Sequence, residues 1–217
     1  MKKILLPFLL FLTVITFGQN SKHSTFYDQR KSLFEVLPQT RNEIIFLGNS
    51  ITNGGEWGEL FSNPNVKNRG ISGDDTQGVL DRLYQVTRSK PAKVFILIGI
   101  NDLSKNIPKD TVFFNICKIA NNIRTASPKT KIYIQSILPV NEEFTNFKTL
   151  INKTPEVKWV NENLVKFCKK KDYIFVNLFS HFKNADDDKL NPIYTNDGLH
   201  LLGSGYLLWA QTIKPLL

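Results

Sequence analysis

Residues 44–52 read IIFLGNSIT, in which four apolar residues end at a glycine and polar side chains follow. An unbroken apolar run of this length, bounded by a glycine, is typical of a strand that is covered on both faces. The same layout returns at residues 94–102, VFILIGIND, where the apolar run again stops at a glycine before polar residues. Two such strands predict a parallel sheet that is buried between layers of helices.

Apolar runs and helical patterns alternate along the rest of the chain. The strands that we expect are Ile44–Leu47, Val66–Asn68, Val94–Ile98, Ile132–Ser136 and Tyr173–Val176. Apolar residues at three- and four-residue steps predict helices around residues 28–37, 79–86, 110–127, 157–167 and 203–213. Strand–helix alternation with short links places helices on both faces of a parallel sheet. The sequence therefore predicts one three-layer α/β/α domain over residues 19–217, with about five strands.

The first 18 residues have a different character from the rest of the chain. Lys2 and Lys3 precede an apolar run that ends at Phe17, and the chain turns polar from Gln19 onward. A basic start followed by an apolar run too short to span a bilayer is the pattern of a secretory signal peptide. We predict a signal peptide at residues 1–18 and an exported chain, periplasmic or secreted, with no stable membrane insertion after cleavage. A retained membrane anchor is the alternative.

The formal net charge is +9, but the basic residues are scattered along the sequence. The densest run, Lys169-Lys170-Lys171, fits the last turn of a helix, where cations complement the helix dipole. No basic stripe is interleaved with aromatic residues, so we expect no nucleic-acid partner. Cys117 and Cys168 each fall within an expected helix. An exported chain could join them, although a cysteine on an apolar helix face is more often a buried free thiol.

Ser50, Gly70 and Asn101 come directly after the first three expected strands. Parallel strands end at the same edge of a sheet, where open α/β sheets bind ligands, so these residues are expected to lie together. Ser50 is a nucleophile if a base takes its proton, and otherwise a serine that caps the following helix. The Asn101 amide and the backbone N–H groups of Gly70 and Ser50 can stabilise a developing oxyanion. Taken alone, Gly70 and Asn101 would be ordinary turn residues.

His200 is the candidate base because Asp197 lies three residues before it in a turn. A carboxylate bonded to the Nδ1–H of the ring leaves Nε2 free to accept the serine proton. His23 and His181 have no such acidic neighbour to orient them, and the alternative for His200 is an incidental histidine in an Asp-Gly turn. A serine, a histidine, an aspartate and amide donors are together the parts of an acyl-transfer site, which predicts a serine esterase.

Four segments resemble the sequence blocks of the SGNH (GDSL-type) hydrolases, and they occur in the order of that family. They are residues 48–52 (GNSIT), Gly70, residues 99–102 (GIND) and residues 197–200 (DGLH). The resemblance implies a flavodoxin-like sheet with Ser50 as nucleophile and the Asp197/His200 pair as orienter and base. It also implies that Ser50 N–H, Gly70 and Asn101 are the oxyanion donors. Asn49 departs from the family, which has an aspartate before the serine, so we expect the local hydrogen bonds to differ there.

Within that family the sequence is most similar to small carbohydrate-acting or platelet-activating-factor-acetylhydrolase-like acetylesterases of bacteria. The resemblance implies hydrolysis of small acyl esters, above all O-acetyl esters on a carbohydrate, without a metal or an organic cofactor. The alternatives are a lysophospholipase- or thioesterase-type lipid hydrolase and a catalytically silent glycan-binding module. The acidic run Asp186-Asp187-Asp188 lacks the ligand spacing of a calcium loop and is expected to be a solvated turn.

The longest connection, Pro139 to Lys153, is mostly polar, whereas a lipase that acts on long chains needs a broad apolar acyl channel. Phe144 and Phe147 in this connection, together with Trp57, could stack on a sugar face. Equally, these aromatic residues could pin the connection onto the core. The composition of the connection favours acetyl esters over chains beyond about eight carbons, because acyl pockets discriminate by steric limit and by ~0.8 kcal/mol for each CH₂ they bury.

Overall fold

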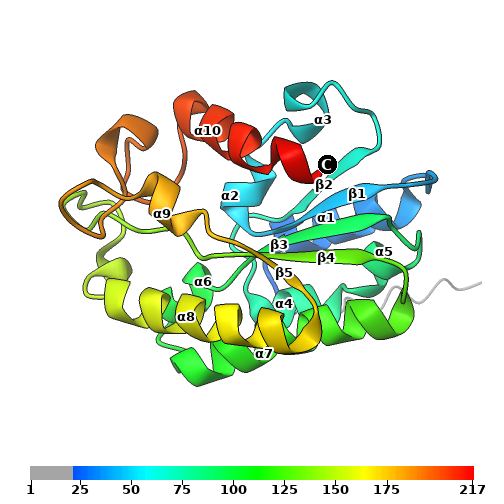
Figure 1. The fold of residues 1–217 in the computed structure, drawn as a ribbon, viewed down its shortest axis with the longest axis horizontal. Helices are drawn as coiled ribbons and strands as arrows, with labels where there is room; N and C mark the ends of the chain where they lie inside the picture. Colours follow the sequence, from blue (N-terminus) through cyan, green and yellow to red (C-terminus); the bar gives the residue numbers. More distant parts are fainter. Residues whose placement is uncertain (1–21) are drawn as a thin grey trace, which may run out of the picture.

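The structure is a computed structural model and describes residues 22–217 of the chain. Its centre is a five-stranded parallel sheet in the order β2-β1-β3-β4-β5 (Figure 1). The strands are β1 (Ile44–Gly48), β2 (Val66–Gly70), β3 (Lys93–Leu97), β4 (Lys131–Gln135) and β5 (Ile174–Val176). The predicted α/β fold with a flavodoxin-like parallel sheet is therefore confirmed. The predicted signal peptide lies outside the described residues.

Helices follow the strands and cover the sheet on both sides (Figure 1). The longer helices are α1 (Thr25–Val36), α7 (Lys109–Ala126), α8 (Thr154–Lys171) and α10 (Gly203–Ile213). The shorter ones are α2 (Ser50–Asn53), α3 (Trp57–Leu60), α4 (Thr76–Asp81), α5 (Tyr84–Thr87), α6 (Ile100–Ser104) and α9 (Phe179–Phe182). Three 3-10 turns complete the set, η1 (Lys148–Leu150), η2 (Pro192–Tyr194) and η3 (Lys214–Leu216).

A row of stacked aromatic rings runs across one face of the sheet. Phe46 on β1, Phe95 on β3 and Tyr133 on β4 are register partners, with ring centroids 5.0 and 4.3 Å apart. Trp57 of α3 stacks on Phe46 at 4.4 Å, and Trp209 of α10 meets Trp57 edge-on at 4.7 Å. This row therefore fixes α3 and α10 over the sheet, and buried aromatic surface of this kind dominates core energetics.

The opposite face of the sheet is covered by α7, which packs against α4 and α8 (Figure 1). The predicted helix around residues 110–127 is α7, and its buried side carries Val112, Ile116, Ile119, Ala120 and Ile123. Because these residues recur mostly at steps of three and four, they form one continuous apolar stripe along the helix. Most of the stability of this helix therefore comes from packing on the sheet.

Trp57 is not available to a sugar, contrary to one of the two interpretations offered for it. Its side chain is only 1% exposed, and its indole N–H donates to the carbonyl of Thr52 at 2.8 Å. The residue is a core anchor beneath the segment that follows Ser50. The stack on Phe46 buries the whole ring system of Trp57, which leaves no ring face for a sugar.

Cys117 and Cys168 are both buried free thiols, and burial raises the pKa of each to about 12. The thiols are therefore poor nucleophiles at neutral pH.

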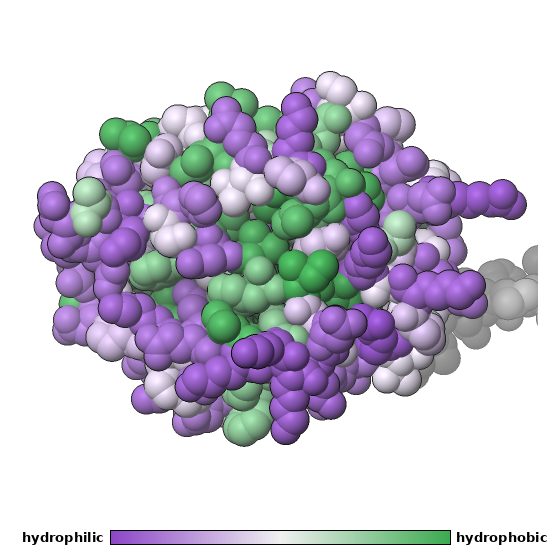
Figure 2. Space-filling model, in the orientation of Figure 1, coloured by the Kyte–Doolittle hydropathy of each residue, from purple (hydrophilic) through white to green (hydrophobic). Residues whose placement is uncertain are grey.

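The three consecutive lysines form the last turn of α8, as predicted. Figure 2 shows hydrophobic side chains at the surface between α8 and α10, where β5 ends the sheet. Along residues 22–217, no helix has the length and apolar character needed to cross a membrane.

Candidate active site

Ser50 is the first residue of α2, at the point where β1 ends (Figure 1). A Cβ on Gly48 would lie 2.2 Å from Thr52 Oγ1 and 2.3 Å from the carbonyl oxygen of Leu97, so only glycine permits this tight turn. Asn49, and not Ser50, caps the helix, because its Oδ1 accepts from the N–H of Ile51 at 3.0 Å. The interpretation of Ser50 as an N-cap is therefore wrong, and its hydroxyl is left for another partner.

That partner is His200. The Nε2 atom of His200 lies 2.9 Å from Ser50 Oγ, and its Nδ1 atom lies 2.7 Å from Asp197 Oδ2. The other carboxylate oxygen, Oδ1, accepts from the backbone N–H groups of Leu199 and His200 at 2.9 and 2.8 Å. The structure thus places the serine, the histidine and the aspartate in one hydrogen-bonded series, although 150 residues separate the first two.

The hydrogen bonds also decide the ionisation of Asp197. Burial alone would raise its pKa, but the bonds from the His200 ring and from two backbone N–H groups outweigh burial and hold the pKa below its usual range. Its side chain is 21% exposed and that of His200 is 36% exposed. A carboxylate that stays ionised beside Nδ1 keeps the proton on that nitrogen, which leaves Nε2 as the acceptor for Ser50.

The connection between β4 and α8 lies on the segment that carries His200. The N–H of Asn141 donates to the carbonyl of Gly198 at 2.9 Å, and the Asn141 amide donates to the carbonyl of Leu190, also at 2.9 Å. The ring of Phe147 meets the His200 ring edge-on, with centroids 5.5 Å apart. At least one aromatic residue of this connection therefore packs on the candidate base itself.

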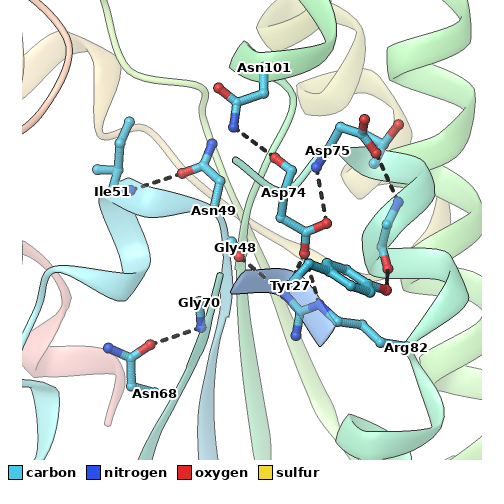
Figure 3. Close-up of polar contacts among 12 residues, drawn as sticks. Tyr27, Gly48, Asn49, Ile51, Asn68, Gly70, Asp74, Asp75, Arg82 and Asn101 are labelled. Atoms are coloured by element: carbon cyan, nitrogen blue, oxygen red, sulfur yellow. Dashed lines mark hydrogen bonds and ion pairs between the residues drawn. The ribbon is translucent and has the colours of Figure 1, made fainter. Parts of the chain in front are cut away.

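Asn101 lies in the first turn of α6, directly after β3 (Figure 1). One N–H of its side-chain amide donates to the backbone carbonyl of Asp74 at 2.8 Å (Figure 3). This bond fixes which end of the amide carries the nitrogen. The second N–H of the same nitrogen remains for another acceptor, since a side-chain amide has two donors.

Gly70 does not fit the predicted role of an oxyanion donor. Its N–H already donates to Asn68 Oδ1 at 2.8 Å (Figure 3), and the Asn68 amide nitrogen is bonded to three carbonyls at the end of α2. A Cβ on Gly70 would lie 2.3 Å from the backbone nitrogen of Asn53. Glycine is therefore needed here for the close approach of β2 to α2. The sequence did contain a sign of this bond: an asparagine side chain often accepts from the backbone N–H two residues later, and Asn68 stands two residues before Gly70.

Gly73 lies three residues after Gly70, in the loop that follows β2, and its surroundings are open. Its φ is +78°, and no atom lies within 4 Å of the position that a Cβ would occupy. Among residues 22–217 its N–H has no hydrogen-bond partner. The next residue is Asp74, whose carbonyl holds the Asn101 amide, so Gly73 belongs to the same short loop as the partner of Asn101.

Two buried carboxylates near Asn101 were missed by sequence reasoning. Asp74 is ion-paired with Arg82, whose Nη2 atom lies 2.7 Å from Asp74 Oδ2, and both side chains are at most 1% exposed. Asp102 accepts hydrogen bonds from Thr76 through its backbone N–H and its hydroxyl. Burial raises the pKa of Asp102 to about 6. Neither contact has a local sequence signal, because each joins residues that only the tertiary fold brings together.

Within the described part of the chain, no group of three or more His, Cys, Asp or Glu residues is arranged to hold a metal ion. In the acidic turn, Asp188 is paired with Lys158 and Lys183, and Asp187 accepts from the backbone N–H of Lys189 and from Asn184. The acidic residues of this turn are therefore engaged by lysines and by local hydrogen bonds.

A parallel α/β sheet with a serine, a histidine and an aspartate in series at a strand end has the arrangement of a serine hydrolase. The sequence profile of the GDSL-like lipase/acylhydrolase family matches residues 46–208. The chain belongs to this family, and it is an ester-hydrolysing enzyme. The resemblance seen in the four sequence segments is thereby confirmed.

Similar proteins are found among plants, mammals and bacteria. A GDSL esterase/lipase of Oryza sativa subsp. japonica is 26% identical over 77% of this chain and 72% of its own length. The platelet-activating factor acetylhydrolase IB subunit alpha2 of Rattus norvegicus is 29% identical over 80% of this chain and 74% of its own. A crystal structure of a GDSL-like lipase from Bacteroides thetaiotaomicron superimposes with a TM-score of 0.78 at 28% identity, covering 88% of this chain and 96% of that one.

Proposed function

We propose that the chain is a serine esterase in which Ser50 is the nucleophile, His200 the general base and Asp197 the residue that orients the base. The observation that carries this proposal is the series Ser50 Oγ–His200 Nε2 at 2.9 Å and His200 Nδ1–Asp197 Oδ2 at 2.7 Å. The first distance is within the range in which a base can take a proton from a hydroxyl, and the second is that of a hydrogen bond that orients the base.

The reaction follows from these positions. Ser50 Oγ attacks the carbonyl carbon of the ester while His200 Nε2 takes its proton, and the electron pair of the C=O bond moves onto the oxygen. The tetrahedral intermediate collapses as the C–O bond to the alcohol breaks, and His200 returns the proton to that leaving oxygen. Water then attacks the acyl-Ser50 ester, again with His200 as base, and releases the carboxylic acid and the free serine.

The negative charge of the intermediate needs donors that are already in place. The second N–H of the Asn101 amide and the backbone N–H of Ser50 are two such donors, since the first N–H of Asn101 is held by Asp74. Gly73 replaces Gly70 as the proposed third donor, because the Gly70 N–H is used by Asn68. The Gly73 N–H has no hydrogen-bond partner among residues 22–217, so it is free to bind a substrate oxygen.

We further propose that the substrates are small acyl esters, above all O-acetyl esters on a carbohydrate. Two observations support this proposal. The connection that carries Phe147 is polar and contacts His200, and a 29% identical relative is named as an acetylhydrolase. Export of the chain, by cleavage near Gln19, belongs to the same proposal and is supported by the basic and apolar pattern of residues 1–18. Mass spectrometry of chain recovered from its host would contradict export if it found Met1 retained in a cytosolic fraction.

A second candidate is a lipid acyl hydrolase, and one specific observation favours it. Large apolar side chains on both sides of the His200 segment are exposed: Ile193 by 62%, Leu202 by 39% and Leu207 by 56%. Exposed apolar groups beside a site can hold an acyl chain, since each buried CH₂ contributes about 0.8 kcal/mol. The two candidates differ in the acyl length that they favour.

The test is steady-state hydrolysis of p-nitrophenyl esters from acetyl to decanoyl by residues 19–217. We expect kcat/KM to be highest for acetyl and to fall steeply beyond about eight carbons, because a short pocket rejects longer chains by steric limit. Ser50→Ala should be inactive on every ester, whereas Ser180→Ala, which removes an exposed serine beside a different histidine, should retain full activity. A kcat/KM that climbs steadily to decanoyl would favour the lipid hydrolase, and an active Ser50→Ala variant would end the serine mechanism.

A further inference from the structure

A buried ion pair outside the proposed triad lies between the strand ends that carry the site (Figure 3). The Nε atom of Arg82 donates to Asp74 Oδ2 at 2.8 Å, and Nη2 lies 2.7 Å from the same oxygen. The Arg82 side chain is 0% exposed and that of Asp74 is 1% exposed. Burial of a charge pair to this extent is weak evidence that the pair stabilises the fold, because well-packed apolar residues in its place often give equal or greater stability.

Arg82 also reaches the turn that carries Ser50. Its Nη2 atom donates to the carbonyl of Gly48 at 3.2 Å (Figure 3), and that carbonyl also accepts from the backbone N–H of Ile71 at 3.1 Å. Gly48 is two residues before Ser50. One guanidinium therefore connects the end of β1 with the loop that follows β2.

The same loop holds Asn101 from the other side. The backbone carbonyl of Asp74 accepts from the Asn101 amide at 2.8 Å, so the position of the Asp74 peptide sets the plane of that amide. Two residues later, Thr76 is fastened to Asp102, and Thr76 also accepts from the amide of Asn115 at 2.9 Å. Residues 74–76 are therefore held at one end by Arg82 and at the other by Asp102.

We propose that Arg82 is a positioning residue for ester hydrolysis: through Asp74 it fixes the Asn101 amide relative to the turn that carries Ser50. This inference rests on the proposed function, because it assumes that Asn101 donates to the oxyanion. Oxyanion donors act only when they are already placed at about 2.7–3.1 Å from the oxygen, so a shift of the Asp74 carbonyl reduces their effect. A shift of about 1 Å in a reacting group can cost about 100-fold in rate.

Arg82→Lys is the first variant, because it keeps the buried positive charge and removes the planar fork. A lysine has one nitrogen and cannot hold both Asp74 Oδ2 and the Gly48 carbonyl in the arginine geometry. We expect kcat to fall by about 10- to 100-fold with KM changed by less than about threefold, since transition-state contacts and not substrate binding are affected. A wild-type kcat in Arg82→Lys would overturn the inference.

The deciding measurement is a double-mutant cycle with Asn101→Ala. If Arg82 acts through the Asn101 amide, Arg82→Lys should change kcat by less than about twofold once that amide is absent. A purely structural role would give the same fold-loss in both backgrounds, and that result would overturn the inference. Ser50→Ala in the same assay tests the proposed function separately: activity in that variant would end the serine mechanism whatever the cycle gives.

Two further variants separate positioning from folding. Tyr27→Phe removes a buried hydrogen bond from the Tyr27 hydroxyl to the Gly78 carbonyl of α4, which is 2.8 Å long. Because the hydrogen bonds of Arg82, Asp74 and Asn101 do not involve Tyr27, this variant should lower the thermal midpoint and leave kcat unchanged. Asp74→Asn combined with Arg82→Met removes both charges and so leaves no buried charge without a partner; it replaces Arg82→Lys in the assay if that variant fails to fold. Its kcat should stay at least about tenfold below wild type, and a wild-type kcat would overturn the inference.

Discussion

Asp102 and Asp197 each lie beside a proposed site residue, yet their environments and their ionisation differ. Asp102 is 2% exposed, and burial raises its pKa to about 6. Asp197 is partly exposed; burial would raise its pKa too, but hydrogen bonds from the His200 ring and the backbone N–H groups of Leu199 and His200 outweigh that effect and lower it. The first carboxylate holds the loop that orients Asn101, and the second holds the proposed base.

The contrast extends to the halves of the site that they serve. The half with Ser50 and Asn101 is fixed by contacts between distant segments, such as Arg82 to Gly48 and Asp102 to Thr76. In the other half, Asp197 bonds to the backbone of residues two and three positions later, as a turn residue does. The half with Ser50 and Asn101 is thus held by buried contacts between distant segments, and the half with His200 by contacts within one partly exposed turn.

The substitutions with the largest expected effect remove the contact between the two halves, the hydrogen bond of Ser50 with His200. Ser50→Ala and His200→Ala should each reduce kcat by at least about 10⁴-fold, because a nucleophile and its base act as one unit. For the same reason, the double variant should be little worse than either single one. Steady-state kinetics on an acetyl ester checks this, and multiplicative losses in the double variant would show that the two residues act independently.

A smaller effect is expected within the buried half. Asn101→Ala removes one proposed oxyanion donor, so kcat should fall by about 10²–10³-fold while KM changes little. The measurement is kcat and KM on the same acetyl ester. A raised KM with an unchanged kcat would assign Asn101 to substrate binding and contradict its role toward the oxyanion.

The smallest effect concerns stability, and it has opposite signs for the two carboxylates. The pKa of Asp102 is raised in the folded state, so the stability that it contributes is present below about pH 4 and is lost as pH rises through about 6. The pKa of Asp197 is lowered, so its contribution is present above the unfolded value and is lost on acidification. Asp102→Asn should therefore gain stability relative to wild type, on the order of 2 kcal/mol, between pH 4 and pH 7.

Urea unfolding of wild type, Asp102→Asn and Asp197→Asn at several pH values checks these signs. The difference between Asp102→Asn and wild type should grow with pH, and the difference for Asp197→Asn should shrink as pH falls below about 4. Parallel curves for wild type and Asp102→Asn would contradict the raised pKa of Asp102.

The comparison also separates what the sequence could and could not predict. The five strands, the long helices and the positions of Ser50, Asn101, Asp197 and His200 follow from local patterns, because apolar periodicity and glycine turns are local. The Asp74–Arg82 pair and the Asp102–Thr76 contact do not, since they depend on how the loops meet in space. Local reasoning about Gly70 was wrong as well, because a glycine after a strand serves a close approach as readily as a hydrogen bond.

We expect Ser50 to form the covalent acyl intermediate, with His200 as its base. The most direct measurement is reaction of the folded chain with a fluorophosphonate, followed by mass spectrometry of the intact protein and its peptides. We expect one adduct per chain on the peptide that contains Ser50, a rate reduced by at least about 10³-fold in His200→Ala, and no adduct in Ser50→Ala. An adduct on any other residue, or labelling of Ser50 that is as fast in His200→Ala as in wild type, would contradict the account.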